Sequence, residues 1–304
     1  MVQLFSGHYT SNTGTAVANS LFNRGVPVRV TGRSRERLEP FMHRGAESVV
    51  SQPSDRTSLA KAFDGATAVY VMLQPGYIPE STDFPAYQRA VIDAIVSALL
   101  EKRVPRVVAL SGWGANYEQV SSPLDGLRVL EKRLQAMGRL KTLILRPGWF
   151  MENASAFIQD IANTGTASGQ LRGDLALPMI ATADIGEVAA YQLVKGEFGD
   201  YAVHELEGPE ALSLNEAAAI VGDLTGHPGA NYRQISAGQA RSQLLSSGFS
   251  RQMADSIMQM TEDVNEERIH MAQPREARII TPTRFQSFAK AVLSNSRAAR
   301  GAES

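Results

Sequence analysis

Residues 3–35 form the stretch that most constrains the fold of this chain. A short apolar segment at 2–6 leads into a turn of small residues between Gly7 and Gly14, and an amphipathic segment at 12–24 and a second apolar segment follow. This order predicts a strand, a turn, a helix and a strand. The N-terminus of such a helix presents free backbone N–H groups and a positive dipole end, which suit a pyrophosphate. The stretch therefore predicts a dinucleotide at the first strand-to-helix turn.

The glycine spacing in this turn is irregular. Gly7 and Gly14 stand farther apart than the outer glycines of a G-x-G-x-x-G pattern, and Ser11 takes the place of a middle glycine. One extra residue enters the loop near His8 and Tyr9, which places these side chains near the phosphates or at the mouth of the site. The turn alone also fits an α/β protein that has lost its cofactor. The flanking strand and helix favour nucleotide binding.

Arginines, and not an acid, follow the second strand. An acid at this position would bind the ribose hydroxyls of NAD, whereas Arg33 can pair with the additional phosphate of NADP. Ser34 can donate a hydrogen bond to the same phosphate, and Arg35 is the weaker candidate. The alternative is that these residues only begin the next helix in solvent. We expect NADP(H) to be the cofactor.

The rest of the first half alternates apolar and amphipathic segments. Strands are predicted at 27–31, 48–51, 67–73, 106–111 and 142–146, and helices at 35–44, 55–63, 86–102 and 124–137. Such alternation predicts parallel strands with right-handed crossovers and helices on both faces of the sheet. The expected fold class is α/β, a Rossmann-type doubly wound parallel sheet with a smaller, mostly helical C-terminal cap.

The second half is mostly helical. Helices are predicted at 150–163, 184–195, 213–224, 239–245, 251–265 and 283–293, with a brief strand at 204–207, a loop at 163–173 and a frayed end at 294–304. Asp184 is expected to cap its helix, and Ser213 with Glu216 forms a capping-box pattern.

These elements suggest a division of the chain into two parts. Residues 1–155 are expected to form the NADP-binding Rossmann core, with 175–200 returning to it. Residues 156–174 and 201–304 are expected to form mostly the substrate-binding cap.

Composition excludes several classes of protein. The chain has 304 residues, no cysteine, and a formal net charge of −1. Disulfides, thiolate metal sites and cysteine nucleophiles are therefore excluded, the five histidines show no metal-ligand spacing, and a polyanion such as nucleic acid is not an expected partner. No signal peptide or membrane-spanning stretch is evident, so we expect a soluble cytoplasmic protein. The sequence does not indicate an oligomeric state.

Several segments across nearly the whole chain resemble the NmrA-like group of atypical short-chain dehydrogenases/reductases. The first turn, at 4–14, resembles that family's T-G-A-T-G-N-T-G, and the second strand ending at Arg33 matches as well. The stretch L-I-L-R-P-G-W-F-M-E-N at 143–153 is close to the family's I-L-R-P-x-x-F-M-E-N. Further matches lie at 107–114 and 177–187. Together these motifs are far more specific than the glycine turn.

The resemblance implies a role for each matching position. Gly7, Thr10, Asn12 and Thr13 would lie at the pyrophosphate, Arg33 and Ser34 at the 2′-phosphate, and Gln52 near the adenine. Met72, Leu73 and Gln74 would lie beside the nicotinamide ribose, and Ser111 and Pro147 with Gly148 would approach the nicotinamide. All of these positions are at the C-terminal ends of strands, where open α/β sheets bind ligands.

The chain departs from ordinary short-chain dehydrogenases at the proton donor. Those enzymes carry a Tyr-x-x-x-Lys pair on the helix after the fifth strand, and the tyrosine position falls at Leu127 here. A leucine cannot transfer a proton. Lys132 does not share the helical face of Leu127, whereas Glu131 can. Conventional ketone reduction is therefore disfavoured, and no catalytic residue is assigned.

Four aromatic residues near strand ends are the candidates for binding a flat substrate: Trp113, Tyr117, Trp149 and Phe150. Ordinary packing beneath the cap is an equal alternative. The first functional hypothesis is an NADPH-dependent oxidoreductase that transfers a hydride to a planar conjugated carbonyl compound or quinone. The second is a non-catalytic regulator that senses NADP(H) and binds a partner protein. The third is a scaffold that has lost the dinucleotide and serves another reaction.

Overall fold

The computed structural model describes residues 2–6, 12–73, 80–118 and 124–302. Its main sheet has eight strands in the order β12-β10-β6-β5-β4-β1-β2-β3. These strands are β1 Val2–Ser6, β2 Val28–Gly32, β3 Glu47–Val50, β4 Ala68–Met72, β5 Arg106–Leu110, β6 Lys141–Pro147, β10 Tyr201–Glu207 and β12 Ile279–Ile280. All paired strands are parallel. Strands β1 to β6 follow the doubly wound order of a Rossmann sheet, which confirms the predicted fold class.

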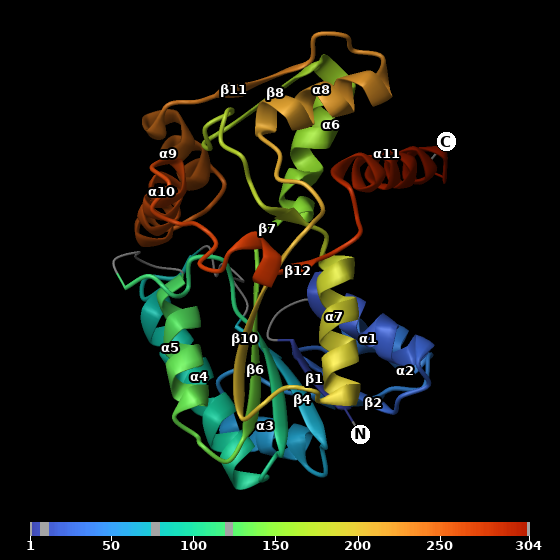
Figure 1. The fold of residues 1–304 in the computed structure, drawn as a ribbon, viewed down its shortest axis with the longest axis vertical. Coiled ribbons are helices and arrows are strands. Elements are labelled where there is room, and N and C mark those ends of the chain that lie inside the picture. Colours follow the sequence, from blue (N-terminus) through green and yellow to red (C-terminus); the bar gives the residue numbers. More distant parts are fainter. Residues whose placement is uncertain (1, 7–11, 74–79, 119–123, 303–304) are drawn as a thin grey trace.

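Helices cover both faces of this sheet (Figure 1). The core helices are α1 Asn12–Asn23, α2 Arg35–Met42, α3 Arg56–Phe63, α4 Phe84–Glu101, α5 Leu124–Gln135 and α7 Thr182–Lys195. One apolar cluster joins the sheet to α1, α2 and α7, and a second joins it to α3, α4 and α5. β4 lies between the two clusters, and all five of its residues are buried. Its uninterrupted apolar run is typical of a central parallel strand.

The contact between α1 and α7 depends on small side chains. A Cβ atom on Gly186 of α7 would lie 2.4 Å from the Cβ of Ala16 on α1. Only glycine at position 186 allows this approach, and it brings the first helix of the chain against a helix that follows much later.

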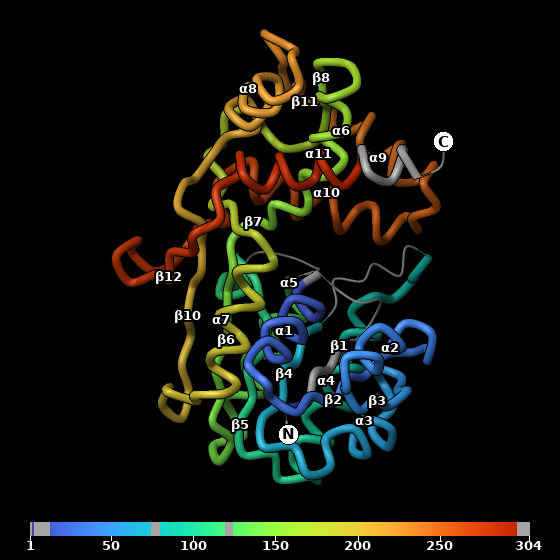
Figure 2. The backbone as a smooth tube through the Cα atoms, turned by 90° about the vertical axis from the view of Figure 1, so that its right-hand side faces the viewer, coloured from blue at the N-terminus to red at the C-terminus, as the bar shows by residue number. Residues whose placement is uncertain are grey.

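The remaining elements form a second lobe above the C-terminal ends of the strands (Figure 2). They are β7 Trp149–Phe150, the 3-10 helix Met151–Ala154, α6 Ser155–Thr164, β8 Thr166–Gly169, β9 Met179–Ile180, α8 Leu214–Thr225, β11 Asn231–Gln234, α9 Ala237–Ser246, α10 Arg251–Asn265, the 3-10 helix Arg275–Ala277 and α11 Phe285–Ala302. A third apolar cluster gathers α6, α8, α11 and the neighbouring loops. Among the described residues, no helix is both long and apolar enough to cross a membrane.

Three expectations about the second half are wrong in detail. The segment 163–173 is not only a loop, because β8 lies within it and pairs with the distant β11. The C-terminal residues do not fray from 294, because α11 continues to Ala302. Trp149 and Phe150 form a strand pair with β9 before the helical segment begins.

The chain returns from the cap to the core sheet. β10 pairs with β6 along its length, and β12 pairs with the end of β10. The division at residue 201 therefore assigns two sheet strands to the range expected to form mostly the cap. Buried carboxylates hold this returning segment. Glu205 accepts the backbone N–H groups of Ala272 and Gln273, and Glu207 pairs with Arg275 and Arg278.

The structure tests two predicted helix starts in the second half. Ser213 and Glu216 form the predicted capping box at α8. α7 begins at Thr182, so Asp184 lies inside its first turn and does not cap it. Glu152 takes that role from outside the helix, because its carboxylate accepts the backbone N–H of Thr182 at 3.0 Å. Burial raises the pKa of the Glu152 carboxyl, and the hydrogen bonds from Thr182 oppose this shift.

Candidate functional site

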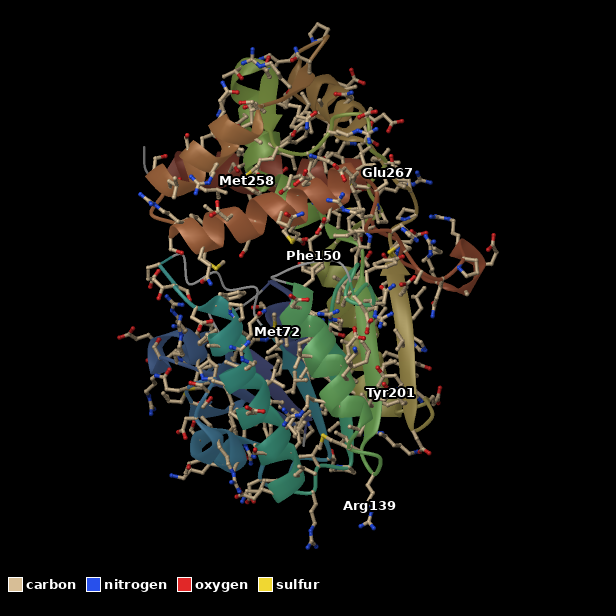
Figure 3. All side chains as sticks on the ribbon, turned by 90° about the vertical axis from the view of Figure 1, so that its left-hand side faces the viewer. Met72, Arg139, Phe150, Tyr201, Met258 and Glu267 are labelled. Carbon is tan, nitrogen blue, oxygen red and sulfur yellow. The ribbon has the colours of Figure 1, made fainter. Side chains whose placement is uncertain are left out.

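The candidate site lies where the parallel strands end beneath the cap. Met72 ends β4, Ser111 directly follows β5, and Pro147 ends β6. Figure 3 shows Met72 and Phe150 at the upper end of the core, with Met258 of α10 on the side of the cap. Strand ends of this kind provide the ligand site in open α/β sheets.

Part of the predicted pyrophosphate turn lies outside the described residues. Gly7 and Thr10 belong to that part, as do His8, Tyr9 and Ser11, and the side chain of Asn12 is not described either. Gln74, predicted beside the nicotinamide ribose, also lies outside the described residues. Thr13 is described and is buried in the first turn of α1. Its hydroxyl lies 3.7 Å from the sulfur of Met72, which brings two predicted cofactor residues together. Leu73 is buried beside them.

The predicted 2′-phosphate region lies at the ends of β2 and β3. Ser34 occupies the N-cap position of α2 but makes no capping hydrogen bond. Among the described residues, neither its buried Oγ nor that of Ser51 has a hydrogen-bond partner. Arg33 is half-buried and lies near Tyr87 of α4: burial raises the pKa of Tyr87, and the charge of Arg33 opposes that shift. The two hydroxyls and the guanidinium form a set of donors that fits a phosphate.

The end of β5 carries a buried polar network. Ser111 is 4% exposed, and its Oγ donates to Oε1 of Glu131 at 2.5 Å. Arg146 of β6 binds the same carboxylate with two hydrogen bonds, from Nε to Oε1 at 2.9 Å and from Nη2 to Oε2 at 2.5 Å. Ser111 follows β5, Glu131 lies on α5 and Arg146 lies on β6. The negative charge of the Glu131 carboxylate is paired with the positive charge of the Arg146 guanidinium.

Leu127 lies on the same face of α5, one turn before Glu131. A Cβ atom on Gly112 would lie 3.2 Å from Leu127 Cδ1, so this leucine packs directly over the residue that follows Ser111. Positions 127 and 131 therefore both face the end of β5, as their spacing predicts. Leu127 is apolar and cannot exchange a proton, and the Glu131 carboxylate is paired with Arg146.

The end of β6 is packed against the cap at a glycine. A Cβ atom on Gly148 would lie 2.1 Å from the carbonyl oxygen of Pro178, and the next residue, Trp149, donates its N–H to that same oxygen at 2.9 Å. Gly148 thus allows the chain after Pro147 to approach the segment that precedes β9.

Replacing Gly148 by alanine is expected to destabilise the protein. Because the obstructing atom belongs to the backbone, the strand end must shift, and we expect a loss of about 1–3 kcal/mol in the free energy of unfolding. Gly199→Ala is a matched control, since a Cβ atom there would meet nothing within 4 Å. Chemical denaturation of both variants measures the difference. Equal stability of the two would contradict the close approach.

Three of the four candidate substrate aromatics are brought together. Trp113, Tyr117 and Trp149 pack on the apolar cluster of the cap, whereas Phe150 packs on the core cluster beneath α1 and α7. Tyr117 lies against the ring of His270, with centroids 4.9 Å apart, and donates its hydroxyl proton to the backbone oxygen of that residue.

A pocket of about 250 Å³ adjoins this group. Trp113 forms part of its wall, with apolar residues from before β9 and from the segment after α10. Glu207, Arg275 and Arg278 line the polar end, where they pair with one another. The indole nitrogen of Trp113 is buried, and no described residue accepts its hydrogen. The pocket thus has an apolar side that includes the Trp113 indole, and a polar side lined by the described residues Glu207, Glu267, His270, Arg275 and Arg278.

Residues 10–195 match a family described as NAD(P)H-binding. The chain belongs to this NAD(P)H-binding family. The match covers the core from the first turn through α7, so the strand ends described above are those of a dinucleotide-binding domain. The NmrA-like resemblance of the sequence motifs agrees with this assignment, and the expected nicotinamide dinucleotide is confirmed at the level of NAD(P)H.

Similar proteins extend the comparison over nearly the full length of this NAD(P)H-binding chain. The prestalk A differentiation protein A of Dictyostelium discoideum is 25% identical over 94% of this chain and 91% of its own. An agroclavine dehydrogenase of Claviceps purpurea is 24% identical over 92% and 93%. Among solved structures, the NADPH complex of a quinone oxidoreductase from Escherichia coli has a TM-score of 0.77 at 20% identity, covering 96% of this chain and all of that one.

Sequence reasoning missed one polar position of this NAD(P)H-binding domain. Gln52, expected near the adenine, has an exposed side chain. The neighbouring Ser51 is buried, and no described residue is a hydrogen-bond partner of its hydroxyl. The signal in the sequence that could have identified Ser51 is that it is a small polar residue directly after a strand. Among the described residues, no group of three acidic or histidine side chains could hold a metal ion.

Proposed function

We propose that this protein is an NADPH-dependent reductase that transfers a hydride to a planar conjugated carbonyl compound or quinone. The observation that carries the proposal is Leu127, which packs over the end of β5 where a conventional ketone reductase needs a proton donor. An acceptor whose reduced form spreads its negative charge over a conjugated system can take its proton from water.

The donors at the ends of β2 and β3 support a preference for NADPH. In this proposal Arg33, Ser34 and Ser51 hold the 2′-phosphate, and Gln52 lies at the edge of the adenine. Gly7, Thr10, Asn12 and Thr13 take the pyrophosphate at the N-terminus of α1. NADPH supplies the hydride when it is bound. Met72, Leu73, Gln74, Ser111 and Pro147 surround its nicotinamide half.

The pocket beside Trp113 is the proposed place for the acceptor. The Trp113 indole in its wall suits a flat molecule, and Tyr117 and Trp149 pack on the same apolar cluster of the cap as Trp113. The quinone oxidoreductase of similar fold and the agroclavine dehydrogenase relative are consistent with such a substrate class.

Titration with NADPH and NADH, followed by a screen of quinones and enones for NADPH oxidation, tests this function directly. We expect tighter binding of NADPH and measurable turnover with at least one conjugated acceptor. Simple ketones are expected to be poor substrates. Binding of NADPH without oxidation by any member of a broad panel would reject the reductase assignment.

Leu127→Ala is expected to leave turnover within about tenfold of the wild type. The side chain packs against Gly112, so its loss changes packing but removes no proton donor. Steady-state rates with saturating NADPH provide the measurement. A fall of several orders of magnitude in a folded, NADPH-binding variant would show that this face of α5 takes part in the chemistry.

Trp113→Ala is expected to raise the KM for a quinone by about 2- to 12-fold, because an aromatic contact contributes roughly 0.5–1.5 kcal/mol beyond its buried area. NADPH affinity should change little. Tyr191→Ala removes an exposed aromatic ring on α7 and serves as the control. Equal KM values for both variants would place the substrate elsewhere.

A second candidate function is a regulator that senses NADP(H). It is favoured by the apolar Leu127 and by the relative named as a differentiation protein. A sensor requires a partner protein whose affinity differs between the free and the NADPH-bound chain, since a ligand without a differential effect on two states cannot signal. Absence of turnover together with such a difference would support it.

A further inference from the structure

The hydroxyl of Ser111 has a fixed direction. It has one proton, and this proton is donated to Glu131 at 2.5 Å. An ionised carboxylate can only accept hydrogen bonds, so the proton cannot turn toward a ligand without breaking this contact. The lone pairs of the Ser111 oxygen are the hydrogen-bonding capacity that remains for a bound molecule.

Arg146 holds the carboxylate in this position. Its two hydrogen bonds to Glu131 are bidentate, and the side chains are 14% and 6% exposed. A charge-assisted pair of this geometry fixes the orientation of the carboxylate and resists its rotation. A serine that polarises a carbonyl group must donate its hydroxyl proton to the carbonyl oxygen. Ser111 differs from such a serine, because its proton is donated to Glu131.

The place of Ser111 in the fold identifies which ligand it can meet. It directly follows β5, a central strand of the dinucleotide-binding sheet, next to the segment that ends β6. Its own N–H group donates to Leu145, and that of Trp113 donates to Pro147, so both strand ends are held together. The nicotinamide half of a dinucleotide lies at such strand ends, and it carries donors in its carboxamide N–H₂ and its ribose hydroxyls.

We propose that Glu131 is a positioning residue that holds Ser111 as a hydrogen-bond acceptor for the nicotinamide half of bound NADPH. The inference rests on the proposed function only in placing the nicotinamide at the end of β5, and it requires no particular substrate. The donor on the cofactor is either the carboxamide or a ribose hydroxyl.

Dissociation constants for three probes test this role. NADPH contains both donors, its 3-acetylpyridine analogue lacks the carboxamide N–H₂, and adenosine 2′,5′-bisphosphate lacks the whole nicotinamide half. The variants are Ser111→Ala, Glu131→Gln and their combination. Glu118→Gln is the control, because it breaks an exposed ion pair with Lys132, the residue next to Glu131 on α5.

Ser111→Ala and Glu131→Gln are each expected to weaken NADPH by about 3- to 10-fold, the value of one hydrogen bond. In the glutamine variant the amide oxygen would turn to Arg146, and the amide N–H₂ would donate to Ser111 and send its proton toward the cofactor. The combined variant should be no weaker than either single one. Binding of adenosine 2′,5′-bisphosphate should not change, and Glu118→Gln should change nothing.

The analogue separates the two possible donors. If the carboxamide donates, the wild type should bind the 3-acetylpyridine analogue more weakly than NADPH, and Ser111→Ala should abolish the difference. If a ribose hydroxyl donates, the analogue should lose as much affinity as NADPH in that variant. Either result supports the acceptor role.

Other results would overturn it. Unchanged NADPH affinity in Ser111→Ala, additive losses in the combined variant, or an equal loss for adenosine 2′,5′-bisphosphate would each reduce Glu131 to a structural role. Ser111→Ala removes no charge, so it carries the test if Glu131→Gln does not fold. Failure of NADPH oxidation with every acceptor would reject the proposed reductase function while leaving these affinities, and this inference, intact.

Discussion

Replacing Arg33 by alanine is expected to weaken NADPH binding by about 10- to 150-fold. A charge-assisted hydrogen bond to a phosphate contributes about 1.5–3 kcal/mol, and each 1.4 kcal/mol corresponds to a factor of ten. NADH lacks the 2′-phosphate, so its affinity should stay within about twofold. Fluorescence titration of both dinucleotides measures the two effects on one variant.

Arg35→Ala is the matched control for this prediction. Arg35 is the exposed first residue of α2, two positions from Arg33. A small effect there combined with a large one at Arg33 would locate the phosphate at the end of β2. Parallel losses of NADPH and NADH in Arg33→Ala would mean that the arginine supports the fold of this edge and does not select the cofactor.

Arg146→Met is expected to lower the free energy of unfolding by about 3–5 kcal/mol. The variant leaves the carboxylate of Glu131 buried without its cation, and an uncompensated buried charge carries a cost of this size. Urea denaturation of the variant and the wild type provides the measurement.

A second substitution distinguishes this mechanism from simple loss of packing. Adding Glu131→Gln to Arg146→Met removes the stranded charge and should recover part of the lost stability. Arg133→Met breaks an exposed pair between α5 and Asp93 of α4 and should cost less than about 1 kcal/mol. A double variant less stable than Arg146→Met would contradict the charge argument.

The central strands β4 and β5 could be predicted because they are buried on both faces and therefore read as apolar runs. β4 is the clearest case. β10 was predicted only from residue 204 onward, because residues 201–203 before it are half-buried. β8 was missed because its sequence, T-A-S-G, shows no apolar alternation and its partner strand lies far along the chain.

The positions of the site residues follow from the rule that ligands bind at strand ends, but their contacts do not. The spacing of Leu127 and Glu131 indicates a shared helical face, and the structure shows that this face meets the end of β5. The pairing with Arg146 joins elements that are separate in sequence, and no local pattern encodes it. The burial of the Ser51 hydroxyl, which has no hydrogen-bond partner among the described residues, is not evident from the sequence alone.

The return of the chain to the sheet through β12 sets an order for folding during synthesis. Glu205 and Glu207, at the end of β10, stay unpaired until Gln273, Arg275 and Arg278 have been made. The dinucleotide-binding strands can pair earlier, because their partners are complete by then. The wall of the Trp113 pocket, which includes Arg275 and Arg278, is completed after these strands, so a nascent chain acquires the dinucleotide-binding strands before this pocket.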